Sequence, residues 1–79
     1  MTYSEIVISR ISTLCKERGI SYYRLEELSG VNLSTIDNII KGNTKNPRIQ
    51  TIHKLAIGFS ITLAEFFNTD EFEEYSFDG

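Results

Sequence analysis

The stretch SGVNLSTIDNIIKG, residues 29–42, decides the fold. Gly30 and Val31 leave room only for a tight turn, and Asn32 is a favourable helix N-cap. Apolar residues then recur every three or four positions: Leu33, Ile36, Ile39 and Ile40. This spacing predicts a short amphipathic helix over about residues 33–41. Its other face carries mostly short polar groups in place of the usual long charged ones: Ser34, Thr35, Asp37, Asn38 and Lys41.

Two helices are predicted ahead of this stretch. Thr2 and Glu5 have the spacing of a capping box, and the apolar residues that follow predict a helix over about residues 3–18. Ser21 can cap a second, short helix, and Gly30 stops that helix at its carboxyl end. The apolar side of the second helix holds Tyr22, Leu25 and Leu28.

Two more helices are predicted after it. Pro47 ends a stretch of turn formers and fits the first position of a helix over about residues 47–58. The apolar residues of that helix are Ile49, Ile52, Leu55, Ala56 and Phe59. Thr62 and Glu65 form a second capping box, which opens a short fifth helix. Because the chain has short connections and no alternating strand pattern, we expect an all-α bundle.

Length and composition limit the class of protein. A chain of 79 residues fits one domain, which buries only about 60% of the surface that it exposes when unfolded. The longest aliphatic run, residues 6–8, is far shorter than the roughly 18 apolar residues of a membrane span, and the amino terminus lacks a signal-peptide pattern. We therefore expect a cytoplasmic protein with no membrane partner.

The chemistry-bearing residues are few. Cys15 is the only cysteine and His53 the only histidine, so no internal disulfide and no zinc-ligand spacing are present. Cys15 is expected to pack as a small hydrophobic residue, and His53 to lie exposed. The sequence has no phosphate-binding glycine loop, no nucleophile and base arrangement and no ligand cluster. We expect no enzyme, cofactor, metal or small-molecule substrate.

The formal net charge of −3 is distributed unevenly. Residues 1–69 carry all eight Lys and Arg against six Asp and Glu, a balance of +2. Residues 70–79 carry no cation and five acidic residues: Asp70, Glu71, Glu73, Glu74 and Asp78. This pattern predicts a mildly basic domain over residues 1–69, followed by an acidic aromatic tail that is either solvated or bound to a partner.

Two short helices joined by a tight glycine turn are typical of a helix-turn-helix, whose second helix can enter the DNA major groove. That groove is about 12 Å wide, and base edges come within reach only if the side chains near the amino end of the helix are compact. The hydroxyl and amide groups of Ser34 and Asn38 meet this condition, and Leu33 could contact a thymine methyl group. The alternative is an ordinary solvated helix face.

From about Ile11 to Phe67 the sequence resembles the helix-turn-helix domains of the phage repressor and Cro type, which many small bacterial regulators share. The resemblance lies in LCKERGIS, LEELSGVNLSTIDNIIKGN and PRIQTIHKLAIGFSITLAEFF. It implies a compact five-helix bundle of the lambda-repressor-like DNA-binding type, with the helix-turn-helix at its centre.

The resemblance also implies the DNA contacts. Base contacts are expected from the amino end of the second helix-turn-helix helix and from one turn later: Asn32, Leu33, Ser34, Asp37 and Asn38. Phosphate contacts are expected from the flanking positions: Tyr22, Thr35, Lys41, Asn43, Lys45 and Arg48. Among these, Lys41, Lys45 and Arg48 form the densest basic group of the chain, as phosphate binding favours. The alternative for Tyr22 is a ring that covers the core and a hydroxyl group in water.

Three features depart from the family pattern. Glu26 stands where the family usually has a small alanine at a close helix crossing, so either the crossing is looser or Glu26 bends outward. Some relatives hold an arginine and glutamate pair where this chain has Cys15 and Ile40, which predicts an apolar contact instead. Asp37 is repelled by phosphates but can accept from a cytosine amino group, so we expect it to favour specificity at some expense of affinity.

The leading hypothesis is a sequence-specific DNA-binding transcriptional regulator, a repressor that binds double-stranded DNA as a homodimer. Its half-sites would lie about one helical turn apart. The alternative is a protein-interaction module, such as an antitoxin or anti-repressor, that uses the acidic tail. Phe66 is expected in the core, whereas the other late aromatic residues could serve the core or a dimer contact: Phe67, Phe72, Tyr75 and Phe77.

Overall fold

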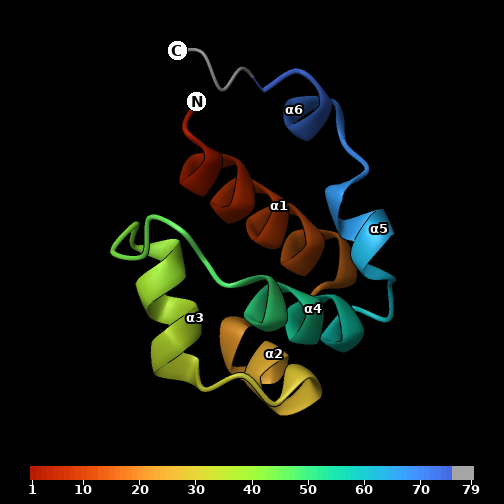
Figure 1. Ribbon diagram of the computed structural model, residues 1–79. Coiled ribbons are helices and arrows are strands. Elements are labelled where there is room, and N and C mark those ends of the chain that lie inside the picture. The colour runs from red at the N-terminus through yellow and green to blue at the C-terminus, as the bar shows by residue number, and fades with distance from the viewer. Residues whose placement is uncertain (76–79) are drawn as a thin grey trace.

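The computed structural model describes residues 1–75, and that part of the chain is helical without strands (Figure 1). Its helices are α1 (Tyr3–Arg18), α2 (Tyr22–Ser29), α3 (Leu33–Ile40), α4 (Ile49–Gly58), α5 (Leu63–Phe67) and α6 (Asp70–Glu73). In Figure 1, α2, α3 and α4 lie on one side of α1, and α6 lies at the opposite end from α2. The predicted all-α bundle is confirmed. None of the helices in residues 1–75 has the length and apolar character that a membrane crossing requires.

Both predicted capping boxes are present. The Thr2 hydroxyl group accepts from the Glu5 amide at 3.2 Å, and the Glu5 carboxylate accepts from the Thr2 amide at 2.7 Å. Thr62 and Glu65 repeat this arrangement at the start of α5, with both distances at 3.0 Å. The hydrogen bond from the backbone amide stabilises each charged carboxylate, so the pKa of Glu5 and that of Glu65 are lowered.

The core lies where α1, α2, α3, α4 and α5 meet. Its buried residues are Val7, Ile11, Leu14, Cys15, Leu25, Val31, Ile36, Ile39, Ile52, Leu55, Ala56, Phe59 and Phe66. The packing roles predicted for Cys15 and Phe66 are therefore confirmed, and burial raises the pKa of the Cys15 thiol. Ile40 is half-buried against the same core, and its direct contact with Cys15 stays a prediction.

The predicted start of α4 is wrong. The helix begins at Ile49 with Arg48 as its N-cap, so Pro47 precedes the cap and does not occupy the first helical position. A proline lacks the amide hydrogen and has a fixed φ, and both properties suit a position ahead of a helix as well as one inside its first turn. Pro47 is buried at this position.

Two residues assigned to apolar faces are exposed. Ile49 is 57% exposed and Leu28 of α2 is 41% exposed. The buried face of α4 begins one turn later, at Ile52, and Leu25 is the buried residue of α2. Helical spacing gives the direction of a side chain, but burial also requires a neighbouring element to cover it.

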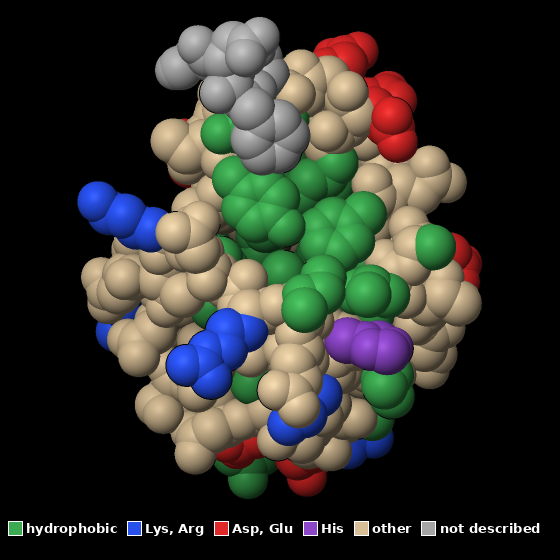
Figure 2. All heavy atoms as spheres, in the orientation of Figure 1, with side chains coloured by type: hydrophobic (Ala, Val, Ile, Leu, Met, Phe, Trp, Pro, Cys, Tyr) green, Lys and Arg blue, Asp and Glu red, His purple; other side chains and the backbone are tan. Residues whose placement is uncertain are grey.

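The predicted tail begins with α6, which packs against α1. Phe72 is half-buried, and its ring centroid lies 4.9 Å from that of Phe67 and 6.0 Å from that of Tyr3. Figure 2 shows hydrophobic side chains gathered on the face between α6 and α4. The division of the chain at residues 69 and 70 stays a prediction, and Phe77 and Asp78 lie outside the described residues.

Candidate nucleic-acid interface

A short, fixed turn joins α2 to α3. Gly30 has φ +74°, in the left-handed region that favours glycine, and its amide donates to the Glu26 carbonyl at 2.9 Å. The Val31 amide donates to the Ser29 hydroxyl group at 3.1 Å, and the Val31 side chain is buried. These bonds and this burial hold the predicted helix-turn-helix in one geometry.

Asn32 caps α3 as predicted. Its side-chain oxygen Oδ1 accepts from the Ser34 amide at 2.9 Å and from the Ser34 hydroxyl group at 2.7 Å. Its backbone carbonyl accepts from the Thr35 and Ile36 amides at 2.9 and 3.1 Å. Three of the four amides that open α3 are therefore satisfied by Asn32 alone.

The fourth amide is satisfied from another helix. The Leu33 amide donates to Oε2 of Glu26 on α2, at 2.5 Å. Glu26 is half-buried and turns toward the start of α3, so it does not bend outward. The amino end of α3 thus has each of its first four amides bonded within the protein.

The polar face of α3 lies on the surface. Asn32, Ser34, Thr35 and Asn38 are exposed, and Leu33 and Asp37 are half-buried. On the opposite side Ile36 and Ile39 are 0% and 1% exposed and belong to the core. The structure therefore brings the five residues predicted to contact bases together along one uncovered side of α3 and its cap.

Two of the predicted contact residues are paired with each other. Oδ2 of Asp37 lies 2.7 Å from Nζ of Lys41, four residues later on the same helical side. Their side chains are 48% and 63% exposed, so the pair is mostly in water and stabilises the fold by about 0–1 kcal/mol. Asn38 and Asn43 also meet, with Nδ2 of Asn43 donating to Oδ1 of Asn38 at 3.4 Å.

Predicted phosphate contacts flank this face on the loop between α3 and α4. Lys45 and Arg48 are exposed there, and within residues 1–75 neither has an ion-pair partner at 4.0 Å or closer. Thr35 and Arg48 line the same surface hollow, together with Ile39, Thr44, Asn46, Pro47 and Thr51. The hollow presents a cation and several hydroxyl and amide groups, a combination that suits a phosphate group.

Three other arginines have structural partners. Arg10 donates to the Glu65 and Phe66 carbonyls at the end of α5, each at 2.8 Å. Arg18 donates to the Phe59 carbonyl at the end of α4, at 2.9 Å. Arg24 lies 3.5 Å from Glu27 on α2. These contacts help to explain why the free cations of the described chain concentrate near α3 and α4.

Tyr22 on α2 and His53 on α4 are the other two residues singled out by the sequence. The Tyr22 ring is half-buried against the core, in agreement with the alternative of a core-covering ring, and its phosphate contact stays a prediction. His53 is exposed, as predicted. No three His, Cys, Asp or Glu residues lie close enough in residues 1–75 to hold a metal ion.

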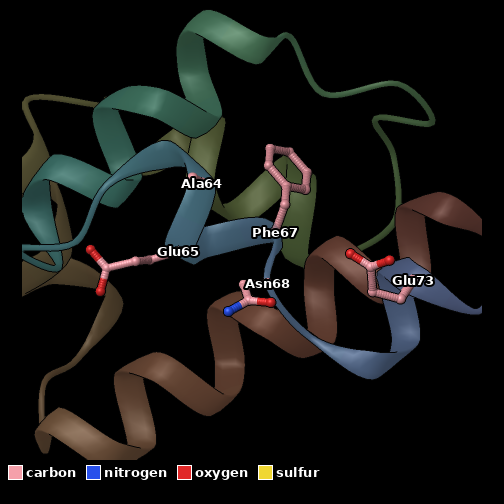
Figure 3. Close-up of a pocket in the computed structure, with 5 residues that line it drawn as sticks. All are labelled: Ala64, Glu65, Phe67, Asn68 and Glu73. Carbon is pink, nitrogen blue, oxygen red and sulfur yellow. The ribbon is translucent and has the colours of Figure 1, made fainter.

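A separate hollow lies between α5 and α6. It is lined by Ala64, Glu65, Phe67, Asn68 and Glu73, and Figure 3 shows Glu65 and Glu73 on either side of Phe67 and Asn68. The Glu65 carboxylate already accepts from Thr62 in its capping box. With two carboxylates and no cation, this hollow does not suit phosphate.

Sequence reasoning missed two features of the interface. The Asp37 and Lys41 pair has the i, i+4 spacing of a helical ion pair, which is a signal that could have predicted it. The bond between Glu26 and Leu33 spans seven residues and a turn, so no local pattern predicts it.

Known proteins resemble the chain in sequence and in fold. Residues 10–71 match the family model of the Cro/C1-type HTH DNA-binding domain. The HTH-type transcriptional regulators PuuR of Escherichia coli and of Shigella flexneri are each 36% identical to the chain over 62 residues, which are 78% of this chain and 33% of the relative. The chain thus spans about a third of the length of these relatives. The crystal structure of the prophage Lp1 protein 11 is similar, with a TM-score of 0.83 and 28% identity, covering 95% of this chain and 99% of that one.

Proposed function

The chain belongs to the family of Cro/C1-type helix-turn-helix DNA-binding domains, and from this premise we propose that it recognises specific DNA sequences by inserting α3 into the major groove. The observation that carries the proposal is the uncovered side of α3, where short polar side chains stand opposite the buried Ile36 and Ile39. A helix with compact side chains near its amino end can approach base edges closely enough to hydrogen-bond them.

In this proposal the residues divide into two groups. Those that read bases are Asn32, Leu33, Ser34, Asp37 and Asn38. Those that hold phosphates are Tyr22, Thr35, Lys41, Asn43, Lys45 and Arg48. The exposure of Ser34 and Asn38 supports the first group, and the hollow shared by Thr35 and Arg48 supports the second.

The protein would act in the cytoplasm by binding rather than by catalysis, as a repressor that occludes a promoter. The name of the similar PuuR proteins, transcriptional regulators, supports a regulatory role. We propose a homodimer because residues 1–69 have a net charge of only +2, which gives one copy weak attraction to DNA. The described residues 1–75 measure 37 × 24 × 21 Å, a size compatible with one copy on each half-site about 34–36 Å apart.

The test begins with selection of bound sequences from random duplex DNA. Affinity for the selected site and for a random duplex is then measured over a series of salt concentrations. We expect affinity to fall steeply with salt, and the selected site to be two-fold symmetric and bound at least about a thousandfold more tightly than random DNA. Equal affinity for both duplexes, or no dependence on salt, rejects the proposal.

Single substitutions distinguish the residues that read bases from those that hold phosphates. Asn38→Ala and Ser34→Ala should reduce the preference for the selected site, whereas Lys45→Ala and Arg48→Ala should weaken binding to all DNA and each lower the salt slope by about 1. Ser12→Ala and Lys16→Ala are the matched controls, since both residues are exposed on α1 outside the helix-turn-helix. Equal effects in the controls would show that the interface lies elsewhere.

A second candidate function is a protein-interaction module, such as an antitoxin or anti-repressor. It is favoured by the exposed carboxylates of α6 and its C-cap, Asp70, Glu71, Glu73 and Glu74. Figure 2 shows acidic side chains at the α6 end of the molecule. Glu71→Gln and Glu74→Gln remove two of these charges without changing the Phe72 side chain itself. Loss of a copurifying partner with unchanged DNA binding would support this second function.

A further inference from the structure

One hydrogen bond joins the two helices of the helix-turn-helix through a side chain. The Glu26 carboxylate on α2 accepts from the amide of Leu33, the first residue of α3, at 2.5 Å. Among the side-chain bonds of residues 1–75, no other connects α2 to α3. The bond therefore fixes the first turn of α3 relative to α2 independently of the backbone connection.

We propose that Glu26 is a positioning residue for DNA recognition: it sets the place of the first turn of α3, and with it the base-reading side chains of Leu33 and Ser34. This inference rests on the proposed function. Hydrogen bonds to base edges require donor and acceptor distances of about 2.7–3.2 Å, so a small displacement of this turn abolishes them. Glu26 itself touches no DNA in this proposal.

The amides of the first turn show why Glu26 is needed. Asn32 bonds the amides of Ser34, Thr35 and Ile36, but it does not bond that of Leu33. Leu33 is half-buried, so without Glu26 its amide loses a protein partner at a place with restricted access to water. The first turn of α3 is then held to α2 by one hydrogen bond fewer, so it frays or moves more easily.

Glu26 also places a negative charge beside the helix that would face the DNA phosphates. Charges within about 10 Å interact at 0.1 M salt, so this carboxylate weakens binding to DNA of every sequence. Glu26 thus lowers the affinity for DNA of every sequence, and it also holds α3 in a fixed position. The two effects can be separated, because the amide oxygen of a glutamine can accept the same bond without the charge.

The chain provides a matched control in the adjacent residue. Glu27 carries the same charge on the same helix, but it is exposed and pairs with Arg24 at 3.5 Å. A change at Glu27 therefore removes a neighbouring negative charge and leaves the bond to α3 intact.

The experiment measures, for full-length variants, the ratio of affinities for the selected site and for a random duplex. Glu26→Ala is expected to lower this ratio about tenfold, while Glu26→Gln keeps the ratio and raises affinity for both duplexes. Glu27→Ala is expected to leave the ratio unchanged. A ratio within about twofold of the native value in Glu26→Ala overturns the proposal, and so does an equal loss in Glu27→Ala or in Glu26→Gln.

A second variant and a measurement without DNA also test the role of the bond between Glu26 and Leu33. If Glu26→Ala does not fold, Glu26→Asp replaces it, because the shorter side chain keeps the charge but does not reach the Leu33 amide; a ratio unchanged in Glu26→Asp also overturns the proposal. Amide hydrogen exchange at Leu33 needs no DNA, and it should accelerate about tenfold in Glu26→Ala and not in Glu27→Ala. If the native protein does not distinguish the duplexes, the proposed function fails, and the exchange rate alone decides whether Glu26 anchors α3.

Discussion

Gly58 of α4 lies against Ser29 of α2 so closely that a β-carbon at position 58 would come within 2.8 Å of the Ser29 β-carbon. It would also come within 3.0 Å of the Ser29 backbone, which cannot rotate away as a side chain can. This contact fixes α2 on α4 just before the turn that leads to α3. The close crossing of α2 and α4 is thus made by a glycine and a serine.

Gly58→Ala should therefore destabilise the protein. Overpacking typically costs about 1–3 kcal/mol, and the better helix propensity of alanine offsets about 1 kcal/mol of this. We expect a lower free energy of unfolding in urea, by up to about 2 kcal/mol. Gln50→Ala, at an exposed position of the same helix, should change stability by less than about 0.5 kcal/mol. A Gly58→Ala protein as stable as the native one would contradict the close crossing.

Acid should weaken the starts of α1 and α5. The pKa values of Glu5 and Glu65 are lowered in the folded protein, so the stabilisation from these charged carboxylates is present above their ordinary value of 4.5. It is lost as the pH falls through the lower pKa values of the folded state. Unfolding temperatures measured from about pH 7 to about pH 3 should show this loss.

Substitutions in the two capping boxes test whether they cause the loss of stability at low pH. Glu5→Gln and Glu65→Gln should each flatten the decline at low pH, because glutamine does not titrate. Glu17→Gln is the control, since Glu17 is exposed near the carboxyl end of α1 and forms no capping box. If Glu17→Gln flattens the curve as much, the decline has another origin.

The pair formed by Asp37 and Lys41 should limit DNA affinity. Both side chains lie on the proposed interface, and the 2.7 Å contact keeps the Lys41 charge partly neutralised. Asp37→Asn should raise affinity for all DNA and increase the salt slope by up to about 1, because Lys41 becomes free to meet a phosphate. It should also weaken any preference for cytosine at one operator position, since asparagine replaces an acceptor-only carboxylate.

Binding over a salt series, with selected and random duplexes, measures both effects of Asp37→Asn. Glu17→Gln changes the net charge by the same amount, but at a site outside the helix-turn-helix. It should therefore raise the affinity for DNA less than Asp37→Asn does. Unchanged affinity in Asp37→Asn would place this residue away from the DNA.

The sequence predicted features that depend on neighbours along the chain. A capping residue and its partner stand three positions apart, as Thr2 and Glu5 do, so the caps and the helices that they open follow from local spacing. The buried positions of α3, Ile36 and Ile39, likewise gave the direction of its polar face. The exposed polar face that the sequence predicted for α3 is confirmed, and its DNA contacts stay a prediction.

Features that depend on distant neighbours could not be predicted. Ile49 fits the apolar spacing of α4, yet no element covers it, and Pro47 is compatible with positions before or within a first turn. The direction of Glu26 depends on where α3 starts in space. The roles of the arginines depend on which helix end each one reaches, since a guanidinium group can cap a carbonyl as readily as it can bind phosphate.

Arg10 and Arg48 differ in this respect, since Arg10 caps carbonyl groups and Arg48 is exposed. Two nitrogens of Arg10 donate to the Glu65 and Phe66 carbonyls, and its guanidinium carbon lies 5.9 Å from the centre of the Phe66 ring. Lysine keeps the charge but cannot form the planar two-carbonyl contact. Arg10→Lys should therefore lower the free energy of unfolding by about 1 kcal/mol, with little change in DNA affinity.

Arg48→Lys should show the smaller change in stability, because Arg48 is exposed and its side chain makes no cap hydrogen bond in α4. It should retain most of the DNA affinity that Arg48→Ala loses, since a lysine still meets a phosphate as a point charge. Urea unfolding and binding to a random duplex separate the two roles. A loss of DNA affinity in Arg10→Lys without a loss of stability would move the interface toward α1 and away from α3.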